Sequence, residues 1–335
     1  MAVLPASVYS REWEVMEIPL GAYRPKNRSL GVSGPLISVI MPAYNAEATL
    51  EDSARSVLNQ TFDDLELIIV DDGSKDGTAD LCQRLEAEDN RVIHLRCQNG
   101  GVSRARNAGI DKAKGGHLAF LDADDLYAPS KLEKQLNRLE DSGADIVTTG
   151  IRRFVVEHGE RKWLGESYPP DLGSAAYQTL LLDMDTTKYV IFNTVLARRE
   201  VFENGLRYDP SLKTGEDWDI WIRAALNNSF ATVNEPLFYY RKHANSATAG
   251  YGNWMTLNSH LRILEKNVSE TVTGASLRKR REGKYLEFLG HSAYSKNYPE
   301  FIKILRKGLF DAHLYKRKRL YEVAKDLILN NIRRG

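Results

Sequence analysis

The sequence predicts an α/β fold with a mostly parallel sheet flanked by helices, followed by a helical extension. Three observations support this prediction. Short apolar runs alternate with amphipathic segments from residue 36 to about residue 150, as in βαβ units. The polar clusters PAYN, DDGS and DADD directly follow three of these runs, and the carboxyl ends of parallel strands share one edge of a sheet. Beyond residue 251 the spacing of apolar residues becomes helical.

The first two apolar runs predict buried strands, each followed by a helix. LISVIM (36–41) is rich in β-branched residues and stops at Pro42. The next segment has apolar residues at positions i, i+4, i+7 and i+8, which is one face of a helix: Leu50, Ala54, Val57 and Leu58. LELIIV (65–70) predicts the second strand, and Asp76 is expected to cap the helix that follows it.

The later elements follow the same alternation before the pattern changes. RVIHLRC (91–97) predicts a third strand, VSRARNAGIDKAK (102–114) a third helix and HLAFL (117–121) a fourth strand. Three more helical segments are expected near the C-terminus: LRKRREGKYLEFLGHSAY, FIKILRKGLFDAHL and KRKRLYEVAKDLILNNI. We therefore expect three parts, namely an N-terminal extension at 1–34, a main domain at 35–250 and a basic helical region at 251–335.

Composition excludes several classes of protein. With 42% hydrophobic and 27% charged residues, the chain fits a globular protein and not a disordered or fibrous one. Cys82 and Cys97 form no CxxC motif, so neither a disulfide framework nor a structural zinc site is expected. No apolar run approaches the roughly 18 residues of a membrane span, and acidic residues interrupt the N-terminus where a signal peptide would be apolar. These features predict a cytoplasmic location.

The acids after the fourth strand suggest chemistry. Asp122 and Asp124 are two positions apart, so in an extended chain both side chains project to the same side. Carboxylate oxygens suit Mg²⁺ or Mn²⁺, which keeps one or two protein carboxylates and completes its shell with water and phosphate oxygens. Such an ion stabilises the charge that gathers on a diphosphate leaving group. Taken alone, the pattern is more typical of a solvated turn.

Four segments in their order and spacing resemble the family 2 inverting glycosyltransferases, which have the Rossmann-like glycosyltransferase A (GT-A) fold. They are SVIMPAYNAEATLEDSARSVLNQTFDDLELIIVDDGSKDGTAD, NGGVSRARNAGI, FLDADDLYAPSKL and GEDWDIWIR. The likeness covers roughly residues 35–245 and makes 35–250 a catalytic domain. It implies that a sugar passes, with inversion and with Mn²⁺ or Mg²⁺, from a UDP-sugar to a hydroxyl of a saccharide or lipid-linked acceptor. Surface polysaccharide or glycolipid synthesis is the expected setting.

The resemblance also implies a nucleotide-binding edge. Ala43 and Tyr44 are expected beside the nucleoside, with Glu47 close behind. Asp72 is expected to accept a hydrogen bond from the N–H of uracil. A carboxylate there would select uracil, because cytosine presents an acceptor at the same position. Arg104, at a helix start, is expected beside the nucleotide, and a solvated helix face remains its alternative.

For the metal, the resemblance makes Asp124 the principal ligand and places Asp122 near both ribose and metal. His243 is assigned an additional metal or phosphate contact, with a structural role as the alternative. Arg241 or Lys242 is expected to neutralise the leaving group.

Three neighbouring residues are expected to be structural or remain open. Asp125 is expected to start the next helix, where the macrodipole favours an acid. Asn107 is expected to cap or brace the chain. Asp71 fits a turn and a functional role equally well.

The general base is expected at the start of the helix in GEDWDIWIR. The resemblance selects Asp217 as the catalytic base that takes the acceptor proton, with Glu216 as the near alternative. Asp219 is expected to be structural or to face the acceptor. Trp218 fits sugar stacking and core packing equally, and Trp221 is expected in the core.

The C-terminal region differs electrostatically from the rest. Residues 251–335 hold 18 Lys and Arg against 8 Asp and Glu, a net of +10, while 1–250 hold 28 against 37, a net of −9. The basic runs 278–281 and 316–319 suit an anionic membrane surface or, equally, a solvated helical face. Nucleic acid binding is not expected, because no recognised module accompanies the charge.

Two other functions compete with the glycosyltransferase prediction. A sugar-nucleotide nucleotidyltransferase would carry a Gly-rich basic signature after the first strand, and PAYNAEATL has none. A non-catalytic sugar- or lipid-binding module would lack the metal or base acids, and here all are present.

Overall fold

The computed structural model describes residues 35–169, 172–183, 193–243, 254–269, 272–294 and 298–311. The predicted extension at 1–34, the basic run at 316–319 and the last predicted helix lie outside these residues. The strands are β1 (Ile37–Ala43), β2 (Leu65–Asp71), β3 (Val92–Arg96), β4 (His117–Phe120), β5 (Leu126–Tyr127), β6 (Ile146–Glu157), β7 (Glu160–Ser167), β8 (Leu196–Arg198) and β9 (Phe230–Arg241).

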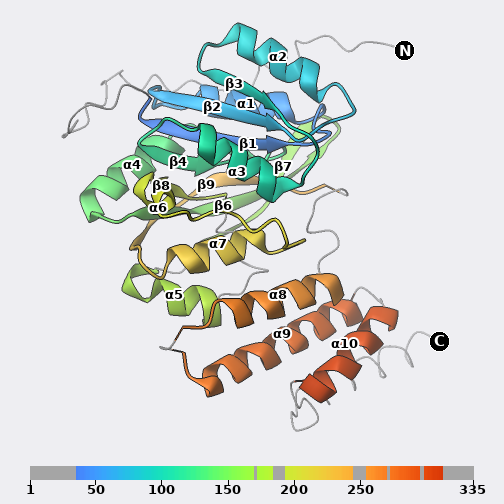
Figure 1. The fold of residues 1–335 in the computed structure, drawn as a ribbon. Coiled ribbons are helices and arrows are strands. Elements are labelled where there is room, and N and C mark those ends of the chain that lie inside the picture. The colour runs from blue at the N-terminus through green and yellow to red at the C-terminus, as the bar shows by residue number, and fades with distance from the viewer. Residues whose placement is uncertain are drawn as a thin grey trace. The chain divides into compact units, whose positions relative to one another are not determined.

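These strands form one sheet in the order β3-β2-β1-β4-β8-β6-β9-β5, with β7 paired to β6 (Figure 1). The β3-β2-β1-β4 part is parallel, as the alternation in the sequence predicts. The pairs of β8 with β4 and β6 are antiparallel, whereas β6 and β9 run parallel. The register pairs Ala43 with Asp71, so the segments that follow β1 and β2 leave the sheet at the same edge.

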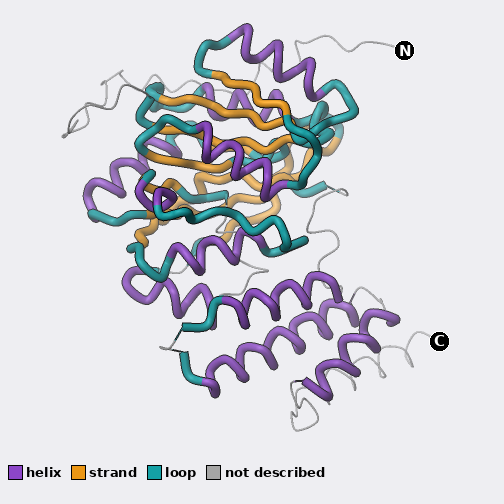
Figure 2. The backbone as a smooth tube through the Cα atoms, viewed as in Figure 1, coloured by secondary structure: helices purple, strands orange, loops and turns teal. Residues whose placement is uncertain are grey.

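Helices cover both faces of this sheet (Figures 1 and 2). The helices of this part of the chain are α1 (Leu50–Leu58), α2 (Thr78–Glu88), α3 (Val102–Lys112), α4 (Lys131–Ser142), α5 (Ala176–Gln178), α6 (Glu200–Glu203) and α7 (Glu216–Ala224), with a 3₁₀ helix η2 (Gly173–Ala175) and a π-helix η3 (Thr179–Asp183). All residues of β1 and β2 are buried, as expected for strands packed on both faces. The predicted apolar face of α1 is buried at Leu50, Ala54 and Val57.

The C-terminal region is helical, as predicted. Helices α8 (Trp254–Lys266), α9 (Gly274–Tyr294) and α10 (Tyr298–Asp311) lie side by side (Figure 1). They bury an apolar cluster of their own: Leu257, Leu261, Tyr285, Phe288, Leu289 and Ile304. Ile263 and Leu264 of α8 belong instead to the core under the sheet, so α8 joins the two sets of side chains.

One predicted cap is shifted by a residue. Helix α2 begins at Thr78, and its N-cap position is Gly77. The carboxylate of Asp76 still accepts from the backbone N–H of Thr78 at 3.1 Å, and its other oxygen accepts from the N–H of Glu47. Asp76 therefore ties the start of α2 to the loop after β1.

Candidate active site

The acidic turn, Asp122 to Asp125, follows β4 at the edge of the sheet. Asp122, Asp124 and Asp125 each offer a carboxylate oxygen, and these oxygens lie within 4.8 Å of one another. Asp122 and Asp124 are half-buried, whereas Asp125 is 2% exposed. The sequence prediction that Asp122 and Asp124 project together agrees with this arrangement.

The predicted role of Asp125 is wrong. Helix α4 begins only at Lys131, and β5 lies between it and the acidic turn. The carboxylate of Asp125 accepts from the backbone N–H of Arg241 at 2.8 Å. The pairing of β5 with β9 stops at Leu126 and Tyr239, so this N–H needs another acceptor, and Asp125 supplies it.

The turn is rich in negative charge. Burial, and then the neighbouring Asp122, raise the pKa of Asp124, and the hydrogen bond to His243 opposes this shift. Burial, and then Asp124 and Asp122, hold the pKa of Asp125 well above its usual range. The gathered carboxyls thus outnumber the cationic side chains beside them, and an excess of hard oxygen donors suits a divalent cation.

The end of β9 approaches the acidic turn. His243 Nε2 lies 2.9 Å from Asp124 Oδ2, so the structure brings these two predicted metal residues together. Arg241 is 8% exposed, and its side chain donates to the backbone carbonyl of Asp124 and to Asp52. It therefore braces the turn, while Lys242 lies exposed beside it.

The predicted base lies at the start of α7. Gly215 precedes the helix with φ +78°, and a Cβ there would stand 2.9 Å from Ile263, so a glycine fits this position best. Glu216 and Asp217 occupy the first turn, with side chains 12% and 18% exposed.

Arg106 connects this helix to the acidic turn. Its side chain projects from α3 and is 2% exposed. Nη1 donates to Glu216 Oε1 at 3.0 Å and to Asp217 Oδ1 at 2.7 Å, and Nη2 donates to Asp122 Oδ1 at 2.8 Å. The sequence analysis assigned no role to Arg106, although its spacing from Gly109 and Ile110 places it on the buried face of α3.

Asp217 has the electrostatics of a base. Burial holds its pKa well above the usual range of an aspartate; Arg106 lowers that pKa, and Glu216 and Asp122 raise it further. A carboxylate with a raised pKa is a stronger proton acceptor near neutral pH.

Asn193 donates to the second oxygen of Asp122 at 2.7 Å, a contact that sequence reasoning also missed.

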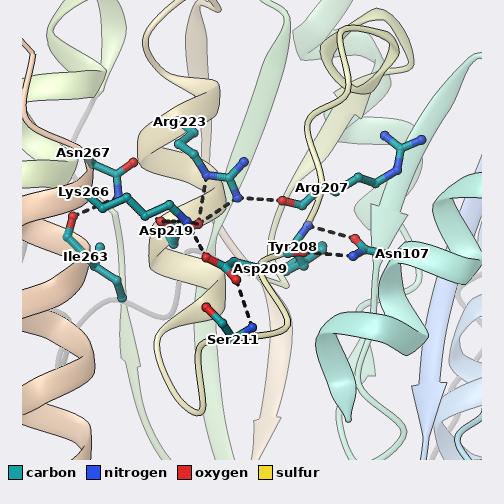
Figure 3. A network of polar contacts seen from close by, with 10 residues as sticks. All are labelled: Asn107, Arg207, Tyr208, Asp209, Ser211, Asp219, Arg223, Ile263, Lys266 and Asn267. Atoms are coloured by element: carbon teal, nitrogen blue, oxygen red, sulfur yellow. Dashed lines mark hydrogen bonds and ion pairs between the residues drawn. The ribbon is translucent and has the colours of Figure 1, made fainter. Parts of the chain in front are cut away.

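The other side chains of α7 are structural. Asp219 is fully buried and accepts from Arg223 Nε at 2.9 Å and Asn267 Nδ2 at 2.8 Å (Figure 3), so the structural alternative holds and the acceptor-facing one does not. Trp218 is 1% exposed and donates to the carbonyl of Leu180, so it belongs to the core. Trp221 is fully buried, which confirms its prediction.

The predicted nucleotide edge is arranged around the end of β2. The carbonyl of Ala43 accepts from the N–H of Asp72 at 2.9 Å. The carboxylate of Asp72 accepts from the N–H groups of Gly100 and Gly101, each at 2.8 Å, and thereby positions the loop before α3. Its contact with a base stays a prediction, but this loop contact is a role that the sequence did not reveal. Tyr44 is 48% exposed beside it.

Other predicted residues of this edge make smaller contacts. Glu47 accepts from the N–H of Gly77 at 3.0 Å, and Arg104 is exposed. Asp71 is fully buried and accepts from the N–H of Ser74, which is its turn role. Asn107 bonds both backbone groups of Tyr208, at 2.8 and 2.9 Å, as the bracing prediction requires (Figure 3).

Comparison with known proteins identifies the family. The model described as Glycosyl transferase family 2 matches residues 38–206, half of the chain. The chain belongs to glycosyl transferase family 2. It is therefore a glycosyltransferase, and the family that the four sequence segments predicted is confirmed. A Bacillus subtilis relative, named as the teichuronic acid biosynthesis glycosyltransferase TuaG, is 36% identical over 221 residues, which are 64% of this chain and 82% of TuaG.

Solved structures show the same fold. S. aureus TarS 1–349, in complex with UDP-GlcNAc, superposes on this family 2 chain with a TM-score of 0.61 at 18% identity, covering 80% of this chain and 79% of that chain. The mannosyltransferase PcManGT from Pyrobaculum calidifontis, in complex with GDP-Man and Mn²⁺, gives 0.54 at 16% identity, over 89% and 87%. These likenesses confirm the predicted GT-A fold. Among the described residues, none of the helices is long and apolar enough to cross a membrane.

Proposed function

We propose that the chain is an inverting, metal-dependent glycosyltransferase that moves a sugar from a UDP-sugar to a hydroxyl of a saccharide or lipid-linked acceptor. The observation that carries this proposal is the placement of Asp217 against the acidic turn through Arg106. Inverting transfer in one displacement needs a base on the acceptor side and charge neutralisation on the leaving-group side. This site contains groups for both.

The chemistry assigned to Asp217 is proton removal. Its carboxylate takes the proton of the acceptor hydroxyl while the hydroxyl oxygen bonds to the anomeric carbon of the donor sugar. The bond from that carbon to the diphosphate oxygen breaks, and UDP leaves with the electron pair. The raised pKa of Asp217 favours this proton transfer. Glu216 remains the near alternative because it shares the contact with Arg106.

The acidic turn fits a divalent ion. Asp122 and Asp124 would hold Mn²⁺ or Mg²⁺, and His243, at 2.9 Å from Asp124, is the further candidate ligand. Asp125 is less available because it accepts from the backbone of Arg241. When bound, the ion would neutralise charge on the diphosphate. The presence of Mn²⁺ in PcManGT, which shares the fold, supports this assignment.

The donor and pathway are proposed from the relatives. TarS is seen with UDP-GlcNAc, which supports a UDP-sugar bound along Ala43, Tyr44, Glu47, Asp72 and Arg104. The name of TuaG refers to teichuronic acid, which supports a role in surface polysaccharide or glycolipid synthesis. Membership of family 2 disfavours the nucleotidyltransferase alternative, and the intact acids disfavour a non-catalytic module.

A donor screen tests this function. Purified protein would be incubated with several UDP-sugars and Mn²⁺, and metal-dependent UDP release would be measured with and without chelator. We expect release that the chelator abolishes. Asp217→Asn should lose transfer and still bind UDP with Mn²⁺; substantial remaining transfer would remove Asp217 from its role.

A peripheral membrane contact is a separate proposal that rests on the basic run in α9. Arg280 lies over the Trp218 ring at 5.8 Å and Arg281 pairs with Glu265, so these two charges are used within the protein. Arg278 and Lys279 are exposed. Exposed basic groups near an anionic surface contribute about 1 kcal/mol each. Retention on anionic vesicles at low salt, compared with neutral vesicles, tests the contact, and equal retention on both would exclude it.

A further inference from the structure

We propose that Arg106 is a positioning residue that couples the acceptor-side base to the donor-side acidic turn, so that a change on one side alters ligand binding on the other. This inference rests on the proposed function and adds a mode of communication within the same site. We call Arg106 with Asp122, Glu216 and Asp217 the Arg106 clamp. The clamp joins three elements that are distant in the sequence: α3, the acidic turn and α7.

The two ends of one guanidinium group serve the two sides of the site. Nη1 donates to Glu216 and Asp217 of α7, whereas Nη2 donates to Asp122. A planar guanidinium presents donors in a rigid fork, and a lysine ammonium cannot span the same two directions. Arg106 is therefore suited to connect the sides and not merely to supply charge.

The surroundings of Arg106 show that the carboxylates determine its position. Its Nε–H is buried and has no hydrogen-bond partner among the described residues. Leaving a buried N–H unpaired is unfavourable, so the gain from the three carboxylates outweighs it. The guanidinium also lies over the ring of Tyr208 at 5.1 Å, and Asn107 holds the backbone of Tyr208 on both polar groups. The clamp thus has a fixed support.

The clamp contains more negative than positive charge, and this excess couples the acceptor side of the site to the donor side. One buried cation is shared among three carboxylates. If Asp217 loses its charge, the attraction of Arg106 is concentrated on Asp122 and Glu216, and Asp122 becomes less available to a cation at the acidic turn. Coupling between two binding events is reciprocal, so donor-side occupancy must in turn affect Asp217.

A double-mutant cycle tests the clamp by equilibrium binding and not by turnover. The affinity of Mn²⁺ for the UDP-saturated protein would be measured by calorimetry in wild type, Asp217→Asn, Arg106→Gln and the double variant. We expect Asp217→Asn to weaken Mn²⁺ binding by roughly 5-fold, at the low end of typical couplings. In the Arg106→Gln background the same change should have no effect. Equal effects in both backgrounds, or none in wild type, would overturn the proposal.

Further variants keep the test decisive if Arg106→Gln does not fold. Glu216→Gln removes the other Nη1 partner and should weaken Mn²⁺ binding in the same direction as Asp217→Asn. Asp219→Asn changes an acid of the same helix whose side chain bonds Arg223 and Asn267 and not Arg106, and it should leave the Mn²⁺ affinity unchanged. An equal loss in Asp219→Asn would show a general effect of helix charge and would refute the clamp.

The outcomes separate this inference from the proposed function. If wild type transfers a sugar and binds Mn²⁺ with UDP but the cycle is additive, the clamp is wrong and the function stands. If wild type binds neither, the proposed function fails. In that case the clamp is tested by urea unfolding of the same four proteins without ligand. Additive changes in the free energy of unfolding for the two substitutions would refute it.

Discussion

Two neighbouring acids of α7, Asp217 and Asp219, should respond to substitution in opposite ways. Asp219 is fully buried and holds α7 to α8 through Asn267 and Lys266, as Figure 3 shows. Asp217 is directed to the site through Arg106. We predict that Asp219→Ala lowers stability with little effect on the chemistry of the folded fraction, whereas Asp217→Asn abolishes transfer with little loss of stability.

The size of the Asp219→Ala effect follows from the partners it leaves. One N–H of Asn267, on a residue 6% exposed, loses its acceptor, which costs about 1–3 kcal/mol. Arg223 and Lys266 are 23% and 41% exposed and keep other partners, so each loses only about 0–1 kcal/mol. Together these contributions predict a destabilisation of about 3 kcal/mol, close to the range for breaking a buried pair.

For Asp217→Asn the loss is kinetic. A positioned general base contributes about 10²–10⁴-fold to the rate, so transfer should fall by that factor. Its pKa is raised in the folded protein by burial and by Glu216, so a neutral amide is well tolerated there. The unfolding free energy should therefore change little.

Urea unfolding and initial rates of UDP release, measured on the same preparations, provide the test. Rates would be normalised to the folded fraction. If Asp219→Ala retained wild-type stability but lost transfer by 10²-fold, the assignment of Asp219 as structural would be wrong. If Asp217→Asn kept most of its activity, Glu216 would become the base.

Three further outcomes are expected. Because the pKa of Asp217 is raised, the acid limb of the pH profile of kcat/KM should lie above the value of about 4 typical of aspartate; a limb near 4 would contradict this. Gly115→Ala should destabilise by about 1–3 kcal/mol in urea unfolding, because its Cβ would stand 2.5 Å from a backbone nitrogen, whereas Gly116→Ala, the control, has only ordinary contacts. Burial, and then Lys284 and Arg280, hold the pKa of His260 well below its usual range. As the pH drops below about 6.5, His260 is protonated only in the unfolded chain, so the free energy of unfolding should decrease by up to about 1.4 kcal/mol per pH unit. His260→Gln should flatten this slope.

Local patterns were sufficient to predict most of the fold. The parallel strands and the helices between them were predicted because burial on one or both faces leaves a periodic trace in the sequence. The same logic located Asp122 and Asp124 after β4, and the resemblance to the family selected Asp217. These predictions required only the order of elements along the chain and the rule that parallel strands end at one edge.

Long-range partners could not be predicted in this way. Arg106 and Glu216 are 110 residues apart in the sequence, and nothing in SRARN indicates that its second arginine meets an acid pair. Asp125 was assigned to a helix start because its acceptor duty to the backbone of Arg241 depends on where β9 stops. Trp218 fits a sugar platform or a core equally until the position of η3 is known.

The charge of the site explains why metal binding and base strength belong together. The acidic turn holds three carboxyls, and Glu216 and Asp217 add two more; the buried Arg106 pairs with three of these five, and Arg241 is engaged at the edge. A diphosphate brought to this site without a cation would meet net negative charge and be repelled. Burial, and then Glu216 and Asp122 from the same excess of carboxyls, raise the pKa of Asp217. A divalent ion on the donor side would lower that excess of negative charge. Because Arg106 contacts both Asp122 and Asp217, donor binding and the proton affinity of the base are expected to change together.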